Sequence, residues 1–304
     1  MRLSFALVIA FVPYVALAQT KQKKETLKWV IELQDLTGGF YASPKEPGSD
    51  AKPQPNLRAT SAAARAIKYL GGEIPNKDKH AAFVLKCFDP KTGGFAEPSG
   101  KPDVTITSIG VMAAAELGIP KEKYAKAMDY LKENAKTFED VRIGAAAVEA
   151  WGVKDCPFKL DEWAKIAEQQ AFGGLKPLLT LESLRDGEAR DWGSVVAFDV
   201  RLGLIPSKTF FDDGVGGFLR LGQRDDGGWG KRGEKSSDIE TTYRVMRALM
   251  LIKEKPKDMP ALRKFLESHR NKDGGYATKP DDKSSVGGVY YAVVVTKWLD
   301  EMEK

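Results

Sequence analysis

The chain has 304 residues, with 47 Lys and Arg against 42 Asp and Glu, and a formal net charge of +5. Its 42% hydrophobic and 29% charged residues are typical of a globular protein, which excludes disordered and collagen-like chains. The small, dispersed basic excess argues against a nucleic-acid partner, and 2 His and 2 Cys are too few for a multi-Cys zinc module or a disulfide scaffold.

The N-terminus has the pattern of a secretory signal. Arg2 precedes an apolar run over residues 3–12, and Ala16-Leu17-Ala18 provides small residues at the spacing of a cleavage site. The run is short and interrupted by Pro13, so an uncleaved membrane anchor is the less favoured alternative. We expect a signal peptide over 1–18, cleavage near Ala18, an exported (periplasmic or secreted) chain, and no membrane span after signal removal.

A Gly-Gly turn followed by an apolar residue recurs along the chain. The copies are Gly38-Gly39-Phe40, Gly93-Gly94-Phe95, Gly227-Gly228-Trp229 and Gly274-Gly275-Tyr276, with a weaker copy at Gly173-Gly174-Leu175. Glycine provides the positive φ that a turn needs, and the apolar residue after it packs the turn onto a core. The turns therefore divide the chain into repeated units.

A polar stretch and then a helix of small residues follow these turns. Six such helices are predicted, at 57–70, 104–117, 141–151, 192–202, 239–252 and 286–299. Their spacing of about fifty residues is typical of helical repeats, although the third unit lacks its own Gly-Gly turn and is shorter. A second, amphipathic helix with more charge lies between each helix end and the next turn.

The unit is thus a helical hairpin with one small apolar helix and one amphipathic helix. A helix that is apolar on every face is buried or lines an enclosed space. We expect an all-α fold, an α/α toroid of six helical hairpins with the small apolar helices inside and the amphipathic helices outside. An open solenoid is the alternative, but it needs polar ends, and the last helix is strongly apolar. Nothing resembles a linker, so one domain is expected over 19–304.

The Gly-Gly-aromatic turn followed by a helix bearing Thr and Tyr resembles the prenyltransferase and squalene-cyclase repeat. The clearest copy combines Gly227-Gly228-Trp229-Gly230 with the segment 238–243, Asp-Ile-Glu-Thr-Thr-Tyr. The resemblance covers most of the mature chain and implies an α/α toroid. In size the chain is most similar to a protein geranylgeranyl- or farnesyltransferase β subunit, which would make it a transferase.

The resemblance also implies a zinc site, which this sequence retains only in part. The family's Asp-x-Cys-Tyr motif falls on Glu240-Thr241-Thr242-Tyr243, and the last repeat has Gly287 and Gly288 where the family has its histidine. Glu240 can replace the carboxylate, but Thr242 cannot replace the thiolate that zinc prefers. Because two of the three ligands are missing, we expect no metal ion and no other cofactor.

Two carboxylates are the catalytic candidates. Class II terpene cyclases carry an Asp-x-Asp-Asp-Thr motif, and its similarity to residues 238–242 makes Glu240 the candidate proton donor and Asp238 its neighbour. An acid that protonates an alkene must be kept protonated by its surroundings. The alternative for Asp238 is simple capping of the helix that follows.

The candidate ligand-binding residues surround this motif. Glu240, Tyr243, Arg244 and Arg247 share one helix face, where the alternative role is an intrahelical ion pair. Basic residues near this loop grip the diphosphate in prenyltransferases, and the corresponding residues here are Lys231 and Arg232. Aromatic candidates for an isoprenoid tunnel, or alternatively for the core, are Trp192, Tyr243, Tyr290 and Tyr291.

The remaining reactive side chains carry no catalytic pattern. His80 and His269 fall on outer helices and are expected at the surface. No H-E-x-x-H or G-x-S-x-G motif is present. Export permits a disulfide between Cys87 and Cys156, but two separate thiols remain equally open.

The leading functional prediction is a prenyltransferase-like toroid that binds an isoprenoid or other apolar ligand in its central cavity, with catalysis in doubt. The first alternative is a non-catalytic exported scaffold whose rim binds a peptide, a glycan or an envelope protein. The second is a terpene-cyclase-like enzyme with Glu240 as the acid.

Overall fold

The computed structural model describes residues 11–45, 53–170, 180–205 and 214–304. The first ten residues of the expected signal peptide and the weak turn at Gly173-Gly174 lie outside these ranges, and the predicted cleavage near Ala18 stays a prediction. Within the described ranges the chain forms helices and no strand, and extended residues pair in isolated bridges such as Phe88 with Phe95. The predicted all-α class is confirmed.

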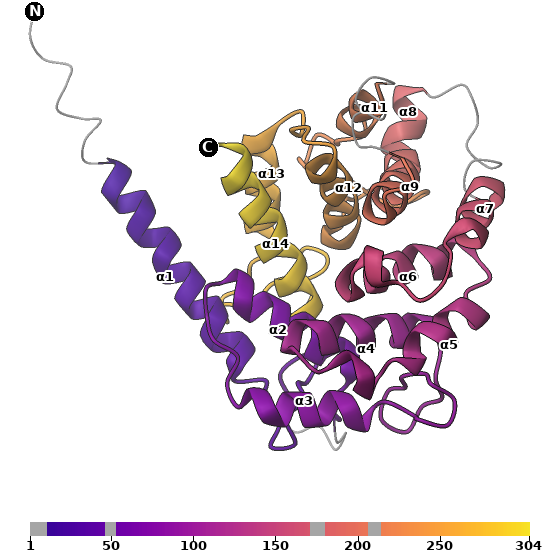
Figure 1. Cartoon of the computed structure of the whole chain (residues 1–304). Helices are drawn as coiled ribbons and strands as arrows, with labels where there is room; N and C mark the ends of the chain where they lie inside the picture. Colours follow the sequence, from indigo (N-terminus) through magenta and orange to yellow (C-terminus); the bar gives the residue numbers. More distant parts are fainter. Residues whose placement is uncertain (1–10, 46–52, 171–179, 206–213) are drawn as a thin grey trace, which may run out of the picture.

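Six helices form a closed inner ring (Figure 1). They are α2 (Leu57–Tyr69), α4 (Val104–Leu117), α6 (Phe138–Trp151), α9 (Ala189–Leu202), α12 (Ile239–Leu251) and α14 (Val286–Met302). Each packs against the next, and α14 returns to pack against α2. The ring is therefore closed, as predicted, and the observed helix ends lie within three residues of the expected ones.

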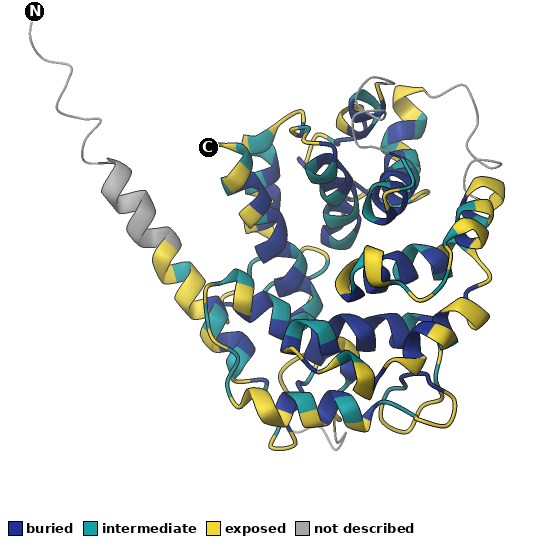
Figure 2. Cartoon of the chain, viewed as in Figure 1, coloured by how far each residue is buried: buried dark blue, intermediate teal, exposed yellow. Residues whose placement is uncertain are grey.

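A second layer of helices covers the outside of this ring, as the colours for burial show (Figure 2). It comprises α3 (Lys77–Lys86), α5 (Lys126–Asn134), α7 (Asp161–Gln170), α11 (Val215–Leu221), α13 (Met259–Ser268) and α1 (Phe11–Ile31). Short elements are η1 (Lys121–Lys123), η2 (Val153–Asp155), α8 (Leu181–Ser183) and η4 (Leu184–Glu188). Helix α1 packs against both α2 and α14, so the N-terminal helix completes the hairpin that the C-terminal helix begins.

One hydrogen bond recurs between a Gly-Gly turn and the inner helix after it. In each case a threonine Oγ1 on the helix accepts from the backbone N–H of the aromatic residue in the turn. The pairs are Thr60 with Phe40 at 2.9 Å, Thr107 with Phe95 at 3.0 Å, and Thr242 with Trp229 at 3.0 Å. Because the threonine must face its turn in the outer layer, this bond sets the rotation of the helix about its own axis.

The two histidines are buried, and their predicted surface placement is wrong. His80 and His269 are each 1% exposed. His80 stacks on Phe40 and hydrogen-bonds to the carbonyl oxygen of Gly38, while His269 lies against Phe265 and bonds to its carbonyl oxygen. Both rings therefore pack against apolar partners inside the outer layer, and burial lowers the pKa of each.

Both cysteines are free thiols. Cys87 is buried and Cys156 is half-buried, and burial raises the pKa of Cys87 to about 12. The disulfide that the sequence left open is absent. Among the described residues, no helix is long and apolar enough to cross a membrane.

Gly227 tests whether the repeated turn must approach its outer helix closely. Its φ is +91°, and a Cβ there would lie under 3.0 Å from the backbone of Ala261 in α13. We expect Gly227→Ala to lower the free energy of unfolding by about 3 kcal/mol or more, because backbone strain and overlap add together. Chemical denaturation measures this loss.

Gly71 provides the matched control. Its φ is +80°, and nothing lies within 4 Å of the position of its Cβ. Gly71→Ala should therefore cost only the strain of a left-handed alanine, about 1 kcal/mol. Equal losses in the two variants would show that the turn does not depend on close contact with α13.

Candidate functional site

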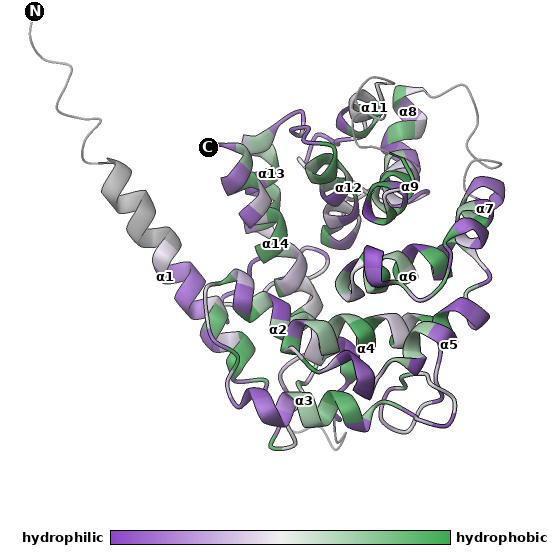
Figure 3. Ribbon diagram, viewed as in Figure 1, coloured by the Kyte–Doolittle hydropathy of each residue, from purple (hydrophilic) through white to green (hydrophobic). Residues whose placement is uncertain are grey.

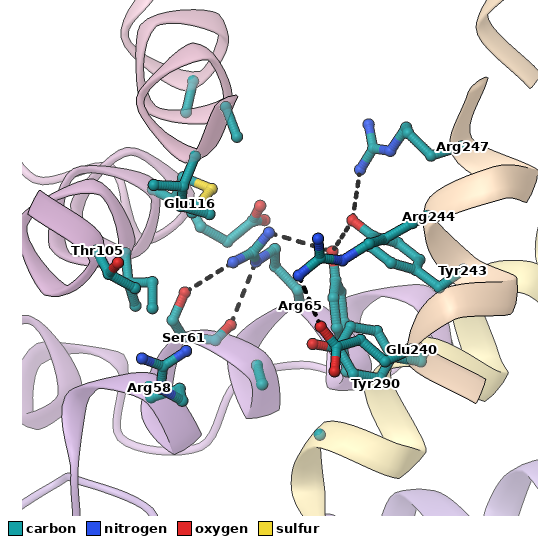
Figure 4. A pocket seen from close by; sticks show the side chains of 18 of the residues that line it. Arg58, Ser61, Arg65, Thr105, Glu116, Glu240, Tyr243, Arg244, Arg247 and Tyr290 are labelled. Atoms are coloured by element: carbon teal, nitrogen blue, oxygen red, sulfur yellow. Dashed lines mark hydrogen bonds and ion pairs between the residues drawn. The ribbon is translucent and has the colours of Figure 1, made fainter. Parts of the chain in front are cut away.

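A cavity of about 960 Å³ lies within the ring, and side chains from all six inner helices line it (Figure 4). It follows the helices from first-turn residues such as Arg58 and Glu240 to late residues such as Lys68 and Glu149. This volume is at the upper end of the range for small-molecule sites. The cavity is thus large enough for a ligand of isoprenoid size.

Charged side chains project into this cavity although the inner helices are rich in small apolar residues. Hydrophilic segments are visible on inner helices such as α12 (Figure 3). The charged lining residues are Arg58, Arg65, Lys68, Glu116, Glu139, Arg142, Glu149, Arg201, Glu240, Arg244 and Arg247. Positive side chains outnumber negative ones, so the lining favours an anionic ligand over a neutral one.

Near the N-terminal ends of the helices, charges pair across the ring. Glu240 accepts a hydrogen bond from Arg244 at 2.8 Å, and Arg244 lies 3.7 Å from Glu139 of α6. Glu139 also accepts from Arg142 at 2.7 Å. Burial alone would raise the pKa of Glu240, but Arg244 and Lys231 outweigh it and hold that pKa below its usual range. Glu240 is therefore a carboxylate at neutral pH.

Farther along the cavity, two guanidinium groups share one carboxylate and a third has neutral partners. Glu149 of α6 lies 3.1 Å from Arg201 and 3.9 Å from Arg247. Arg65 of α2 donates instead to two neutral groups, the hydroxyl of Ser61 at 2.9 Å and the hydroxyl of Tyr290 at 3.1 Å. Among the described residues it has no ion-pair partner. This region therefore has an uncompensated positive charge.

Tyrosines from α12 and α14 lie within this positive region. The hydroxyl oxygens of Tyr243 and Tyr290 are 3.2 Å apart, and Arg247 donates to Tyr243 at 3.1 Å. Burial would raise the pKa of Tyr243, but Arg247, Arg201 and Arg65 outweigh it and lower that pKa to about 7. The pKa of Tyr290 is raised, chiefly by burial. The pair therefore combines a readily ionised hydroxyl with a resistant one.

The structure places the sequence-predicted site residues in two groups. One group lines the cavity: Glu240, Tyr243, Arg244, Arg247, Tyr290 and Tyr291. The other group lies outside the lining: Asp238, Lys231, Arg232 and Trp192. The cavity-facing group includes the whole helix face predicted from the i, i+3, i+4, i+7 spacing in α12.

The residues outside the lining have other contacts. Asp238 is 4% exposed and caps α12, with one oxygen accepting from the N–H of Thr241 and the other from its hydroxyl. Arg232 pairs with Asp191 at 3.0 Å, and Lys231 reaches Glu240 at 3.7 Å.

Trp192 packs against Phe218 with ring centroids 6.1 Å apart. Of these four residues, Lys231 alone contacts a cavity-lining side chain through an ion pair among the described residues.

Sequence reasoning missed Arg65, Arg201 and Glu149. Each is an isolated charge in or beside a run of small or apolar residues, as in Ala62-Ala63-Ala64-Arg65-Ala66. A long charged side chain in a helix that is otherwise packed against its neighbours must face whatever space the ring encloses. A charged residue that interrupts the apolar pattern was therefore the signal that could have identified these three positions.

The residues present do not fit the zinc ion that the family resemblance implied. The hydroxyl of Thr242 is engaged with the Trp229 turn, and a side chain at Gly288 would overlap the backbone of Tyr276. No group of three or more His, Cys, Asp or Glu side chains is placed to hold a metal in the described part of the chain. Zinc chemistry therefore has no support in the residues of this site, and the expectation of no cofactor stays a prediction.

Glu149 tests the imbalance of charge around the tyrosines. We expect Glu149→Gln to lower the free energy of unfolding by about 1–2 kcal/mol, since Arg201 and Arg247 would lose their shared carboxylate in a partly solvated cavity. Added sulfate should restore more stability to this variant than to the parent protein, because an anion can take the place of the lost charge. Thermal unfolding with and without sulfate measures both effects.

Glu116→Gln is the control for general effects of salt and of charge. Glu116 also lines the cavity, but its partner Lys68 is largely exposed, so this loss should cost under about 1 kcal/mol. If sulfate stabilises the two variants equally, the excess positive charge around Glu149 does not govern anion binding.

Comparisons with known proteins agree with this architecture. Residues 9–149 and 206–304 match the family model of the prenyltransferase alpha-alpha toroid domain, whereas no curated protein matches the chain. The type II terpene cyclase MstE from Scytonema superposes with a TM-score of 0.59 at 10% identity, over 93% of this chain and 98% of that chain. A variant of MstE in complex with its substrate, geranylgeranyl dihydroxybenzoate, gives a TM-score of 0.57 at 10% identity, over 95% and 99% of the two chains.

A glycosidase variant gives a TM-score of 0.61 at 14% identity, over 95% of this chain and 98% of that chain. These identities are low, so the structural likeness establishes the fold alone. The family model, by contrast, matches well over half of the sequence. The chain belongs to the prenyltransferase alpha-alpha toroid domain family.

Proposed function

We propose that the central cavity binds an isoprenoid or other apolar chain that ends in an oxyanion. The single observation that carries this proposal is the excess of positive side chains that line a cavity of about 960 Å³. Arg65 has no ion-pair partner among the described residues, and Arg201 and Arg247 share Glu149. A ligand with an anionic end would provide the missing negative charge.

Apolar side chains elsewhere in the lining support an apolar ligand body. Helix α4 contributes Ile109, Met112 and Ala115 to the lining, and α6 contributes Ile143 and Ala146. These side chains offer an apolar surface about two helical turns long, which a flexible hydrocarbon chain can contact. The MstE structure, whose substrate carries a geranylgeranyl group, supports the same ligand class through its similar fold.

A binding scaffold for an acidic glycan is the second candidate. Tyr243, Tyr290 and Tyr291 form a cluster with ring centroids 4.9 to 5.6 Å apart, next to Arg65 and Arg247. Aromatic faces and guanidinium groups together suit a carboxylated sugar. This candidate keeps the exported scaffold of the sequence analysis but moves its ligand from the rim to the cavity.

The cyclase alternative has weaker support from the chemistry of Glu240. A proton donor to an alkene must remain a carboxylic acid in the resting protein. Arg244 and Lys231 hold the pKa of Glu240 below its usual range, which favours the carboxylate instead. Glu240 in this setting suits the orientation of Arg244 better than the delivery of a proton.

A binding titration with three probes tests the proposal. We expect the full chain to bind geranylgeranyl diphosphate at least about tenfold more tightly than the neutral geranylgeraniol, which corresponds to one good charge-assisted contact. An oligogalacturonate probes the glycan candidate. Mass spectrometry of lipid extracted from the purified protein should then identify a co-purifying anionic lipid.

Arg65→Gln should weaken geranylgeranyl diphosphate binding about tenfold. Arg220→Gln is its matched control, because Arg220 of α11 pairs with Glu254 at 2.9 Å and lies outside the cavity lining. Tighter binding of oligogalacturonate than of either isoprenoid would favour the glycan scaffold. A lipid-free protein that binds neither isoprenoid would contradict the proposed function.

A further inference from the structure

Four side chains from three helices form a continuous hydrogen-bonded row in the cavity (Figure 4). Arg65 of α2 donates to the hydroxyl of Tyr290 on α14 at 3.1 Å, and Arg247 of α12 donates to the hydroxyl of Tyr243 at 3.1 Å. The two hydroxyl oxygens are 3.2 Å apart. Both tyrosines line the cavity, so this row is open to a bound ligand.

The two tyrosines carry one hydroxyl proton more than the hydrogen bonds of the row require. Each tyrosine oxygen already accepts an N–H from an arginine, and one O–H proton is enough to join the two oxygens. No acceptor for the second hydroxyl proton is found among the described residues. Hydrogen bonding therefore favours a pair that has released one proton, since donors then surround the remaining negative charge.

The charges that face the pair come from every helix around it. Arg65, Arg201 and Arg247 approach from α2, α9 and α12, and Glu149 of α6 pairs with Arg201 and Arg247. Glu116 of α4 acts on Arg65 but is itself paired with Lys68, and Glu240 of α12 pairs with Arg244. From α14, Tyr291 adds a neutral ring 4.9 Å from that of Tyr243. The surplus around the pair is positive.

We propose that Tyr243 and Tyr290 form an acid–base dyad that takes up one proton when an oxyanion binds in the cavity and releases it when the anion leaves. The dyad rests on the proposed function in that it needs an anionic ligand, but not on the identity of its apolar part. Before an anion binds, a tyrosinate neutralises part of the arginine charge around the cavity. A bound oxyanion takes over that role, and the tyrosinate is protonated.

The exchange is a balanced proton transfer. An O–H bond forms at the hydroxyl oxygen of Tyr243, with the proton coming from solvent or from an acidic group of the ligand, and no electrons are transferred. Protonation removes the negative charge of the tyrosine and the ligand brings its own, so each unit of charge lost from the dyad is replaced by one on the ligand. A protonated Tyr243 then stands as a hydrogen-bond donor beside the ligand, which is the arrangement that a general acid requires.

Absorbance of tyrosinate near 295 nm tests the dyad without any substrate. Because the pKa of Tyr243 is lowered to about 7, we expect a step in absorbance with pH that corresponds to ionisation of one tyrosine, with its midpoint near neutral pH. The pKa values of Tyr41, Tyr124, Tyr130 and Tyr276 are all raised, so these residues do not contribute to that step. Tyr243→Phe should remove the step, and the control Tyr130→Phe should leave it.

Sulfate tests the coupling, because it does not titrate between pH 6 and 8. If sulfate binds the protonated dyad, linkage predicts that its affinity falls roughly tenfold from pH 6 to pH 8, and that saturating sulfate moves the absorbance midpoint upward. In Tyr243→Phe the sulfate affinity should not depend on pH. Calorimetric titrations at both pH values measure this difference.

Arg65→Gln tests the dyad while keeping both tyrosines. Loss of this charge should raise the midpoint of the step by about one pH unit. The dyad would be overturned if the parent protein showed no absorbance step, or if the step persisted in Tyr243→Phe. It would also be overturned if sulfate did not bind, or bound with an affinity independent of pH. If the step and the sulfate coupling are found but geranylgeranyl diphosphate does not bind, the proposed function fails and the dyad stands.

Discussion

The bond between a Gly-Gly turn and a threonine of the next inner helix determines which residues reach the centre of this toroid. In α12 the hydroxyl of Thr242 is held by Trp229 in the outer layer. Residues two positions apart in a helix are about 200° apart around its axis, so Glu240 points the opposite way. With Thr242 fixed outward, the face carrying Glu240, Arg244 and Arg247 must line the cavity.

The same bond accounts for the loss of a metal site in physical terms. The family resemblance set Thr242 against a zinc-binding cysteine, but here its side chain completes the turn that orients the helix. In the last repeat Gly288 has the corresponding contact, because its missing side chain lets the backbone of Tyr276 approach. Two positions expected to face a metal therefore serve the packing between turn and helix, and the cavity chemistry depends on arginine and tyrosine instead.

The sequence predicted the fold closely because the fold depends on local signals. Glycine turns, helix caps and small residues recur at each unit, and the predicted helices are confirmed to within three residues. The face of α12 and the tyrosines of α14 were also predicted to form the site, and they do line the cavity. These residues share one helix face or lie next to a motif of the family, so spacing together with the family resemblance could identify them.

The rest of the site could not be predicted because it depends on which helices meet across the ring. Arg65, Glu149 and Arg201 come from α2, α6 and α9, and no local pattern joins them. Small apolar residues dominate these helices because neighbouring inner helices pack closely, which says little about the few side chains that face inward. Lys231 and Arg232 were predicted from their nearness to the motif in sequence, and Trp192 as an aromatic residue of an inner helix, but all three lie outside the lining.

The arrangement of arginines is costly for a structure that serves stability alone. Guanidinium groups removed from bulk water need compensating charge, yet Arg65 has neutral partners and two other arginines share Glu149. Apolar side chains of similar volume would fill the same space without this cost. Local departures from stable packing of this kind are typical of functional sites. A bound anion would offset this cost, which is why we place the proposed function of this toroid at its cluster of arginines.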